Sequence, residues 1–245
     1  MEHATLELPD GRRIAYRRTE GRGPGVVFLG GFRSDMTGTK AQFLEAWARA
    51  RGQAYLRFDY TGHGASSGRF EDGAVGDWTR DAGDAVARLS EGPQVLVGSS
   101  MGGWIALLLA SRLPGRIAGI VTVAAAPDFT EDSIWAGLDA AQRAELAAAG
   151  RVVLPSEYDG SYPVTRRLIE DGRHHLVLRT PLDLPFRVRL LHGAADADVE
   201  LAVALRLLAH AECPDMRLTV VKGADHRFSD PGNLELLAQT LEEIL

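Results

Sequence analysis

The sequence predicts one α/β domain in which helices cover both faces of a mostly parallel sheet. Short runs rich in valine, isoleucine and leucine alternate with longer alanine- and leucine-rich stretches, and most of the short runs end at a loop that contains glycine or aspartate. The chain has 245 residues, of which 45% are hydrophobic and 24% are charged. That length and composition suffice for a single buried core, so we expect residues 1–245 to form one domain.

The first half of the chain supplies most of the expected strands. Two short runs flank the turn Pro9-Asp10-Gly11, which is the pattern of a hairpin at a sheet edge. A glycine-rich turn at 21–25 precedes a run that is apolar throughout, as expected of a strand buried on both faces. The expected elements are, in chain order, strands at 5–8, 13–17 and 26–29, a helix at 41–50, a strand at 54–58, a helix at 78–90, a strand at 95–97, a helix at 100–113 and a strand at 117–123.

The alternation stops between Asp128 and Leu184. This part begins with one helical stretch at 131–149 and continues with a segment that contains prolines and charges but has no clear period. We interpret 128–184 as an insertion that covers the sheet as a lid. The alternation then resumes with a strand at 187–191, a helix at 199–211, a strand at 217–221 and a last helix that Asp230 caps and Pro231 opens.

The composition disfavours several classes of function. The formal net charge is -6 and the arginines are scattered, so nucleic acid is not an expected partner. The single cysteine, Cys213, excludes an intrachain disulfide and a cysteine-rich zinc site, and it fits a cytoplasmic protein. The longest apolar run, 117–126, is about half of what a membrane-spanning helix needs. The start of the chain is polar and acidic, unlike a secretory signal or an organellar transit peptide.

The strongest functional signal joins the strand at 95–97 to the helix at 100–113. The segment Gly98-Ser99-Ser100-Met101-Gly102 fits the G-x-S-x-G nucleophile elbow when Ser100 is the central serine. The two glycines leave space for the sharp turn that presents the serine. Ser99 as the centre would put larger side chains at the glycine positions, so Ser99 is expected to pack beside the elbow.

Two later loops supply the partners that a serine nucleophile needs. Asp196 and His226 each follow one of the last two expected strands, so serine, acid and histidine occur in the chain order of the α/β-hydrolase fold. We therefore predict that fold, with Ser100 as nucleophile, His226 as the base that removes its proton and Asp196 as the residue that orients the histidine. The backbone N–H groups of Phe32 and Met101 are predicted to form the oxyanion hole.

Other polar residues near the predicted triad have alternative interpretations. Asp128 follows an earlier strand and is the main alternative acid. Asp198 is expected to cap the next helix, and His63 is expected to pack or to form hydrogen bonds near the site. No metal is expected, although His192 with two nearby aspartates could be imagined as ligands. No nucleotide cofactor is expected, because the glycines at 21–25 precede a strand and no P-loop motif occurs.

Six segments carry a resemblance to a known family. They are GFRSDMTGTKA at 31–41, DYTGHG at 59–64, VGSSMGGW at 97–104, PSEY at 155–158, LIEDGR at 168–173 and DHR at 225–227. Over nearly its whole length the chain resembles the alpha/beta hydrolase domain-containing protein 10 family, which includes palmitoyl-protein thioesterases and acyl-glucuronide esterases. The resemblance implies hydrolysis of acyl thioesters or esters, with Ser100, Asp196 and His226 at the triad positions. The chain departs from the family at Gly30, where many relatives have the histidine of a His-Gly pair, and at Glu200, which replaces a common proline.

An ester or thioester substrate needs an apolar site for its acyl group. The residues predicted to contribute are Met36, Trp104, Trp135, Tyr158 and Leu182. The predicted substrate is a small-molecule ester or acyl thioester that passes through an acyl-Ser100 intermediate, and an acylated protein is a further candidate. A cofactor-free perhydrolase and a carbon-carbon bond hydrolase use the same triad and are the alternatives. A non-catalytic binding protein would be expected to have lost a triad residue.

Overall fold

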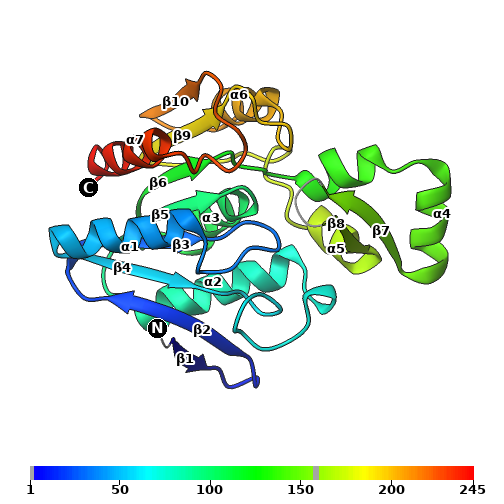
Figure 1. Cartoon of the computed structure of the whole chain (residues 1–245), viewed down its shortest axis with the longest axis horizontal. Helices are drawn as coiled ribbons and strands as arrows, with labels where there is room; N and C mark the ends of the chain where they lie inside the picture. The colour runs from blue at the N-terminus through cyan, green and yellow to red at the C-terminus, as the bar shows by residue number, and fades with distance from the viewer. Residues whose placement is uncertain (1–2, 157–159) are drawn as a thin grey trace.

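The computed structural model describes residues 3–156 and 160–245. In this part of the chain, an eight-stranded sheet has the order β1-β2-β4-β3-β5-β6-β9-β10 (Figure 1). The pairs β1/β2 and β2/β4 are antiparallel and the remaining pairs are parallel. The strands of this sheet are β1 (Ala4–Glu7), β2 (Arg13–Thr19), β3 (Arg22–Leu29), β4 (Gln53–Phe58), β5 (Gln94–Ser99), β6 (Ile117–Val123), β9 (Arg187–Gly193) and β10 (Met216–Val221).

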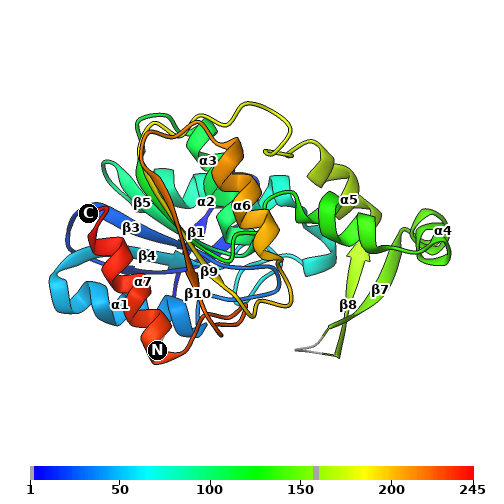
Figure 2. The same ribbon diagram turned by 90° about the horizontal axis from the view of Figure 1, so that it is seen from above.

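Helices cover both faces of the sheet (Figure 2). One face carries α1 (Thr39–Arg51) and α7 (Pro231–Glu242), and the other carries α2 (Val75–Leu89), α3 (Met101–Arg112) and α6 (Leu201–His210). Successive side chains of a strand point to opposite faces, so Val26 and Phe28 pack under α1 and α7 while Val27 and Leu29 pack under α2 and α3. Each buried strand therefore contributes to two cores, which explains its continuous apolar run.

The predicted mostly parallel sheet with helices on both faces is confirmed, with two local differences. β3 begins at Arg22, which pairs with Gln53 before an irregularity that ends at Val26, so the glycine-rich segment at 21–25 lies largely within a strand. α6 begins at Leu201 with Glu200 as its N-cap residue. The prediction that Asp198 caps this helix is therefore wrong.

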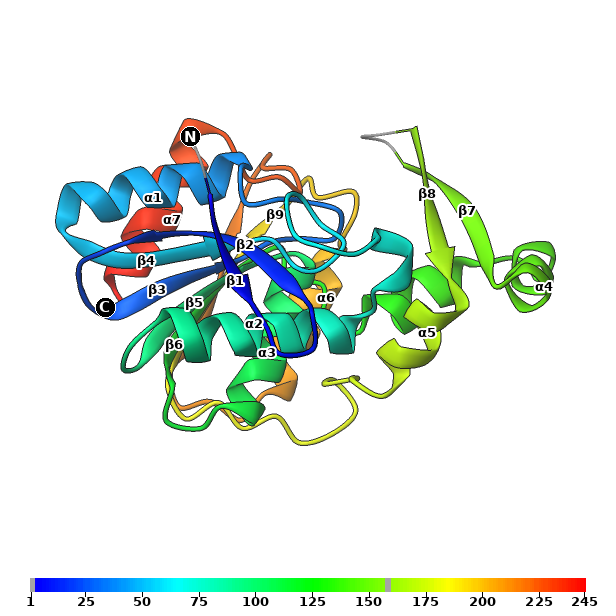
Figure 3. The same ribbon diagram turned by 90° about the horizontal axis from the view of Figure 1, so that it is seen from below.

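The insertion between β6 and β9 projects beyond the end of the sheet (Figures 1 and 3). Its elements are a π-helical segment, η2 (Thr130–Trp135), then α4 (Ala140–Ala149), an antiparallel hairpin of β7 (Arg151–Ser156) and β8 (Gly160–Thr165), and α5 (Arg166–Arg173). The single helix expected at 131–149 is wrong, because Asp139 caps a new helix by accepting a hydrogen bond from the N–H of Gln142 at 2.8 Å. The hairpin was not predicted.

Asp128 joins the two ends of the insertion. Its buried carboxylate accepts the backbone N–H groups of Val177 at 2.7 Å and Leu178 at 3.1 Å, and it pairs with the Arg179 guanidinium at 2.6 Å. Burial raises the pKa of Asp128, and these donors oppose that effect. These partners of the carboxylate are thus groups at the other end of the insertion, whereas the histidine of the predicted triad bonds to Asp196.

The described part of the chain contains no helix that is both long and apolar enough to cross a membrane.

Candidate active site

Ser100 lies in the sharp turn between β5 and α3. Its backbone has φ 54° and ψ -118°, a conformation that a residue other than glycine rarely adopts. A Cβ atom at Gly98 would collide with the backbone of Gly102, and a Cβ atom at Gly102 would collide with the carbonyl group of Leu29. The turn therefore requires glycine at both positions, which is the spacing that the sequence presents around Ser100.

The structure brings Ser100, His226 and Asp196 together although each comes from a different loop. The Nε2 atom of His226 lies 3.2 Å from the Ser100 Oγ, and its Nδ1 atom lies 2.9 Å and 3.1 Å from the two carboxylate oxygens of Asp196. The side chain of Asp196 is almost fully buried, whereas that of His226 is 17% exposed. This geometry lets Nε2 accept the serine proton while Nδ1–H donates to the carboxylate.

Asp196 is held ionised by its hydrogen bonds. Burial by itself would raise its pKa, but donation by His226 and by the backbone N–H groups of Val199 and Asp198, each at 2.9 Å, lowers the pKa below its ordinary value. The carboxylate can therefore stabilise a positively charged His226 when the serine proton is transferred.

The loop that follows β3 runs beside Ser100. A Cβ atom at Gly31 would lie 3.4 Å from the Cβ of Ser100, and the Gly31 carbonyl accepts hydrogen bonds from Ser34 N–H at 3.2 Å and Ser34 Oγ at 2.8 Å. Among the described residues, no protein acceptor is bonded to the backbone N–H of Phe32 or Met101. Both groups are thus available as donors, and their role in an oxyanion hole stays a prediction.

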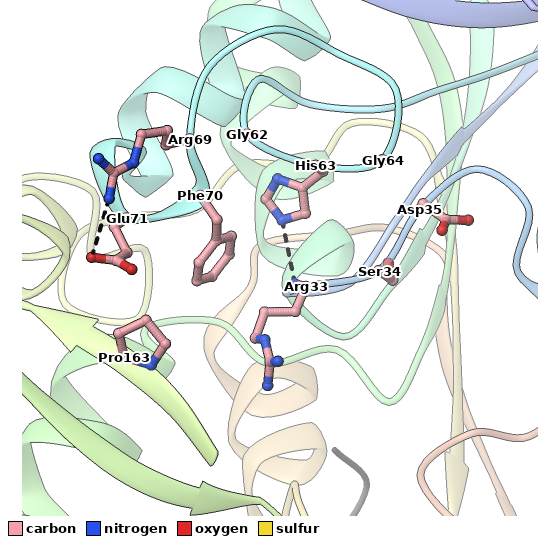
Figure 4. Close-up of a pocket in the computed structure, with 10 residues that line it drawn as sticks. All are labelled: Arg33, Ser34, Asp35, Gly62, His63, Gly64, Arg69, Phe70, Glu71 and Pro163. Atoms are coloured by element: carbon pink, nitrogen blue, oxygen red, sulfur yellow. Dashed lines mark hydrogen bonds and ion pairs between the residues drawn. The ribbon is translucent and has the colours of Figure 1, made fainter. Parts of the chain in front are cut away.

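His63 holds this loop in place through a hydrogen bond to its backbone. Its Nε2 accepts the backbone N–H of Arg33 at 3.3 Å (Figure 4), and its Nδ1–H donates to the Thr61 carbonyl at 3.3 Å. Burial lowers the pKa of His63 to about 4, so the ring is neutral at neutral pH and Nε2 can act as an acceptor. The hydrogen-bonding role expected for His63 is confirmed.

Phe32 is the centre of an aromatic cluster that sequence reasoning did not find. Its ring makes edge contacts with Phe70, Trp78, Phe129 and Tyr162, at centroid distances of 4.9, 5.9, 5.5 and 5.9 Å. Phe129 and Tyr162 belong to the insertion, so the cluster packs the insertion against the loop beside Ser100. Isolated aromatic residues carry no periodic signal, so only the fold reveals that they meet.

A cavity of about 410 Å³ opens beside the same loop (Figure 4). The residues that line it are Arg33, Ser34, Asp35, Gly62, His63, Gly64, Arg69, Phe70, Glu71 and Pro163. None of the five residues predicted for the acyl pocket is among them.

Four of those five residues lie in the described part of the chain. Met36, Trp104 and Leu182 are buried in the core, and the Trp104 Nε1–H donates to the His175 carbonyl at 3.0 Å. Trp135 is half-buried, with guanidinium groups 4.9 Å and 4.7 Å from its ring centroid. Tyr158 lies outside the described residues. The acyl pocket stays a prediction.

Two further aspartates, Asp225 and Asp198, lie in the same loops as His226 and Asp196. Asp225 accepts the backbone N–H of Phe228 at 2.9 Å, which shapes the histidine loop. Asp196, Asp198 and His226 offer ligand atoms within 4.8 Å of one another, a spacing that could hold a metal ion. Both oxygens of Asp196 already accept hydrogen bonds, however, so the donor set fits the orientation of His226 better than it fits a cation.

The fold and this geometry agree with one family model. It is described as the alpha/beta hydrolase family and matches residues 26–239, a span that contains Ser100, Asp196 and His226. The chain belongs to the α/β-hydrolase family.

Relatives place this α/β-hydrolase more closely. It is 34% identical to the palmitoyl-protein thioesterase ABHD10, mitochondrial, of Bos taurus over 98% of this chain and 79% of that protein. The structure of alpha/beta hydrolase domain-containing protein 10 from mouse has a TM-score of 0.93 and 32% identity over 100% of this chain and 98% of that one. A putative hydrolase from Agrobacterium vitis S4 has a TM-score of 0.95 and 39% identity over 99% and 98% of the two chains. The resemblance inferred from the six segments is confirmed.

Proposed function

We propose that this α/β-hydrolase cleaves carboxylic esters or acyl thioesters through an acyl-Ser100 intermediate. The observation that carries the proposal is the hydrogen-bonded chain from Asp196 through His226 to the Ser100 Oγ at the elbow. The name of the ABHD10 relatives, palmitoyl-protein thioesterase, supports an acyl substrate. An acylated protein is therefore a candidate substrate alongside small esters and thioesters.

In the acylation step, the Ser100 Oγ attacks the carbonyl carbon while His226 Nε2 takes its proton. The carbonyl oxygen becomes negatively charged, and the N–H groups of Phe32 and Met101 stabilise it. His226 then protonates the leaving oxygen or sulfur, and the acyl group stays on Ser100. In the second step His226 activates a water molecule, which releases the carboxylic acid and restores the serine.

We further propose that the insertion at 128–184 acts as a lid over the acyl group. The contacts of Phe129 and Tyr162 with Phe32 support this, because they join the insertion to the loop beside Ser100. On this proposal, truncation of Phe32 or Trp135 changes the preferred acyl chain length. An unchanged preference would remove the support for an acyl site there.

We also propose that residues 1–245 form one domain and that the protein acts in the cytoplasm. Pairing of β6 with β9 supports one domain, because the insertion leaves and re-enters the same sheet. The single cysteine supports a reducing compartment. The name of the ABHD10 relatives says that those proteins are mitochondrial.

The test is hydrolysis of matched p-nitrophenyl esters and acyl thioesters, from acetyl to palmitoyl. The enzymes compared are the parent, Ser100→Ala and the control Ser111→Ala, which changes an exposed serine in the same helix, α3. Loss of the nucleophile should lower kcat by roughly four to six orders of magnitude. The control should retain parental activity.

Full activity in Ser100→Ala would refute the acyl-serine mechanism. If the parent hydrolyses none of the esters or thioesters, the two alternatives are tested next. A peroxide-dependent assay detects a perhydrolase, and a diketone substrate detects a carbon-carbon bond hydrolase.

A further inference from the structure

The cavity beside the oxyanion loop has a charged lining. Arg33 and Arg69 contribute guanidinium groups, Asp35 and Glu71 contribute carboxylates, and Phe70 lies between the two arginines (Figure 4). An apolar acyl chain would have to desolvate these groups without replacing their hydrogen bonds, which is unfavourable. A polar part of a substrate fits this cavity better.

The carboxylates of the cavity already have partners, whereas among the described residues the guanidinium of Arg33 contacts the Tyr162 ring but no hydrogen-bond acceptor. Glu71 pairs with Arg151 at 3.2 Å and lies 3.9 Å from Arg69. Asp35 accepts the N–H and the Oγ1–H of Thr37 at 2.7 Å and 2.5 Å. Within the described residues, no carboxylate lies at ion-pair distance from Arg33, and its guanidinium carbon lies 5.6 Å from the centroid of the Tyr162 ring. Among the described residues that line the cavity, Arg33 thus has guanidinium donors that are open to an anion.

The backbone fixes where the Arg33 side chain begins. Arg33 has φ 59°, in the left-handed region that disfavours an arginine, and the hydrogen bond from its N–H to His63 holds it there. A strained conformation persists where its surroundings determine it, and such residues cluster at ligand sites. In Figure 4 the side chain extends away from His63.

Arg33 is close enough to the reaction centre to contact a substrate. It follows Gly31 by two residues, so its Cα is at most about 7 Å along the chain from the residue that lies beside Ser100. Phe32, between them, is the proposed oxyanion donor. A group attached near the scissile bond would therefore reach the cavity while the carbonyl oxygen faces the N–H of Phe32.

We propose that Arg33 binds an anionic group, a carboxylate or a phosphate, on the leaving-group side of the substrate. This inference rests on the proposed function and adds to it a class of leaving group. The planar guanidinium donates two parallel hydrogen bonds to either anion. Arg69, which also lines the cavity, adds positive charge.

The experiment compares three acetyl esters of similar shape. The leaving groups are 4-hydroxybenzoate, 4-hydroxyphenyl phosphate and the neutral 4-hydroxybenzamide. The enzymes are the parent, Arg33→Met, Arg33→Lys and the control Arg217→Met, which removes an exposed guanidinium from β10. For each ester the readout is kcat/KM of the variant divided by that of the parent, so the intrinsic reactivity of the ester cancels.

In Arg33→Met this ratio should be about ten- to hundredfold lower for an anionic ester than for the neutral amide, and the loss should appear mainly in KM. Arg33→Lys should recover part of it, and Arg217→Met should show no difference between the esters. A loss confined to one anionic ester would identify a carboxylate or a phosphate as the ligand. Equal ratios for all three esters in Arg33→Met would overturn the proposal.

A binding measurement separates this proposal from the proposed function. Calorimetry with 4-hydroxybenzoate and phenyl phosphate, on the parent and on Arg33→Met, does not depend on catalysis. If the parent hydrolyses nothing but binds one of these anions more tightly than Arg33→Met does, the proposed function fails and the anion site stands. If the two proteins bind both anions equally, or neither anion binds, the anion site is refuted whatever the esterase assays show.

Discussion

The Nε2 atom of His63 accepts the backbone N–H of Arg33 at 3.3 Å, and this bond joins the loop after β4 to the loop beside Ser100. From the same side, the Tyr60 Oη donates to the Gly30 carbonyl at 3.3 Å. Gly30 lacks a side chain that could brace the loop, so the loop is held by residues of the Asp59–Gly64 segment instead.

Removal of this acceptor should impair catalysis without removing a catalytic group. His63→Phe leaves the N–H of Arg33 without a partner, so the N–H of Phe32 loses its fixed position. We expect kcat to fall about tenfold on an ester that the parent hydrolyses, with a smaller change in KM. His63→Gln keeps an acceptor and should retain most of the activity. Equal losses in the two variants would show that His63 contributes only packing.

The same histidine should make stability depend on pH in a defined window. Its pKa is about 4 in the folded protein and 6.5 ordinarily, so the unfolded chain binds the proton more strongly between these values. Stability must therefore fall as the pH is lowered from 6.5 to 4, by about 3 kcal/mol from this group. Urea unfolding of the parent and of His63→Gln across pH 7 to 4 measures the difference. A difference that does not vary with pH would contradict the assignment.

The sheet and the three residues of the predicted triad could be inferred from the sequence because each leaves a local pattern. Strands such as β3 and β5 are buried on both faces and read as apolar runs. The elbow imposes glycine at fixed distances from Ser100, and the fold imposes the order in which Asp196 and His226 follow.

The insertion and the bracing of the oxyanion loop leave no such pattern. In the hairpin, Val152 is buried and pairs with Val164, while its neighbour Val153 is exposed but equally apolar, so the alternation of burial along β7 does not appear in its sequence. His63 contacts Arg33, which lies 30 positions earlier in the sequence, and Tyr162, from β8 of the insertion, contacts Phe32. Such contacts depend on tertiary packing, which a single sequence does not display.

Asp128 should matter for stability and not for chemistry. In Asp128→Asn the side chain has one acceptor oxygen in place of two, so the backbone N–H groups of Val177 and Leu178 must share it or one of them must face the amide NH₂. Arg179 also loses its buried carboxylate partner. We expect the free energy of unfolding to fall by about 2 to 4 kcal/mol. Asp132→Asn is the matched control, because that carboxylate is more exposed and should contribute about 1 kcal/mol or less. Equal denaturation midpoints for the two variants would refute this function of Asp128.

Lys40 should control the position of the catalytic histidine. From the first turn of α1, its Nζ donates to the carbonyl of Arg227, the residue after His226, at 2.5 Å. Burial lowers the pKa of Lys40 to about 8, and the nearby Asp225 opposes this while Arg227 adds to it. Lys40→Met removes this charged donor and leaves the carbonyl with the Ser229 Oγ–H at 2.9 Å, so His226 is held less firmly against Ser100, and kcat should fall about tenfold with little change in KM.

The pH profile distinguishes this positioning from simple packing. Above a pH of about 8 the parent loses the charge on Lys40, the hydrogen bond to Arg227 weakens, and kcat should decline modestly. Lys40→Met has no such group, so its kcat should stay level over the same range. Lys222→Met, which changes the other lysine of the chain at an exposed position, should keep the parental profile. If Lys40→Met shows the same alkaline decline as the parent, another group titrates there and Lys40 does not position His226 through its charge.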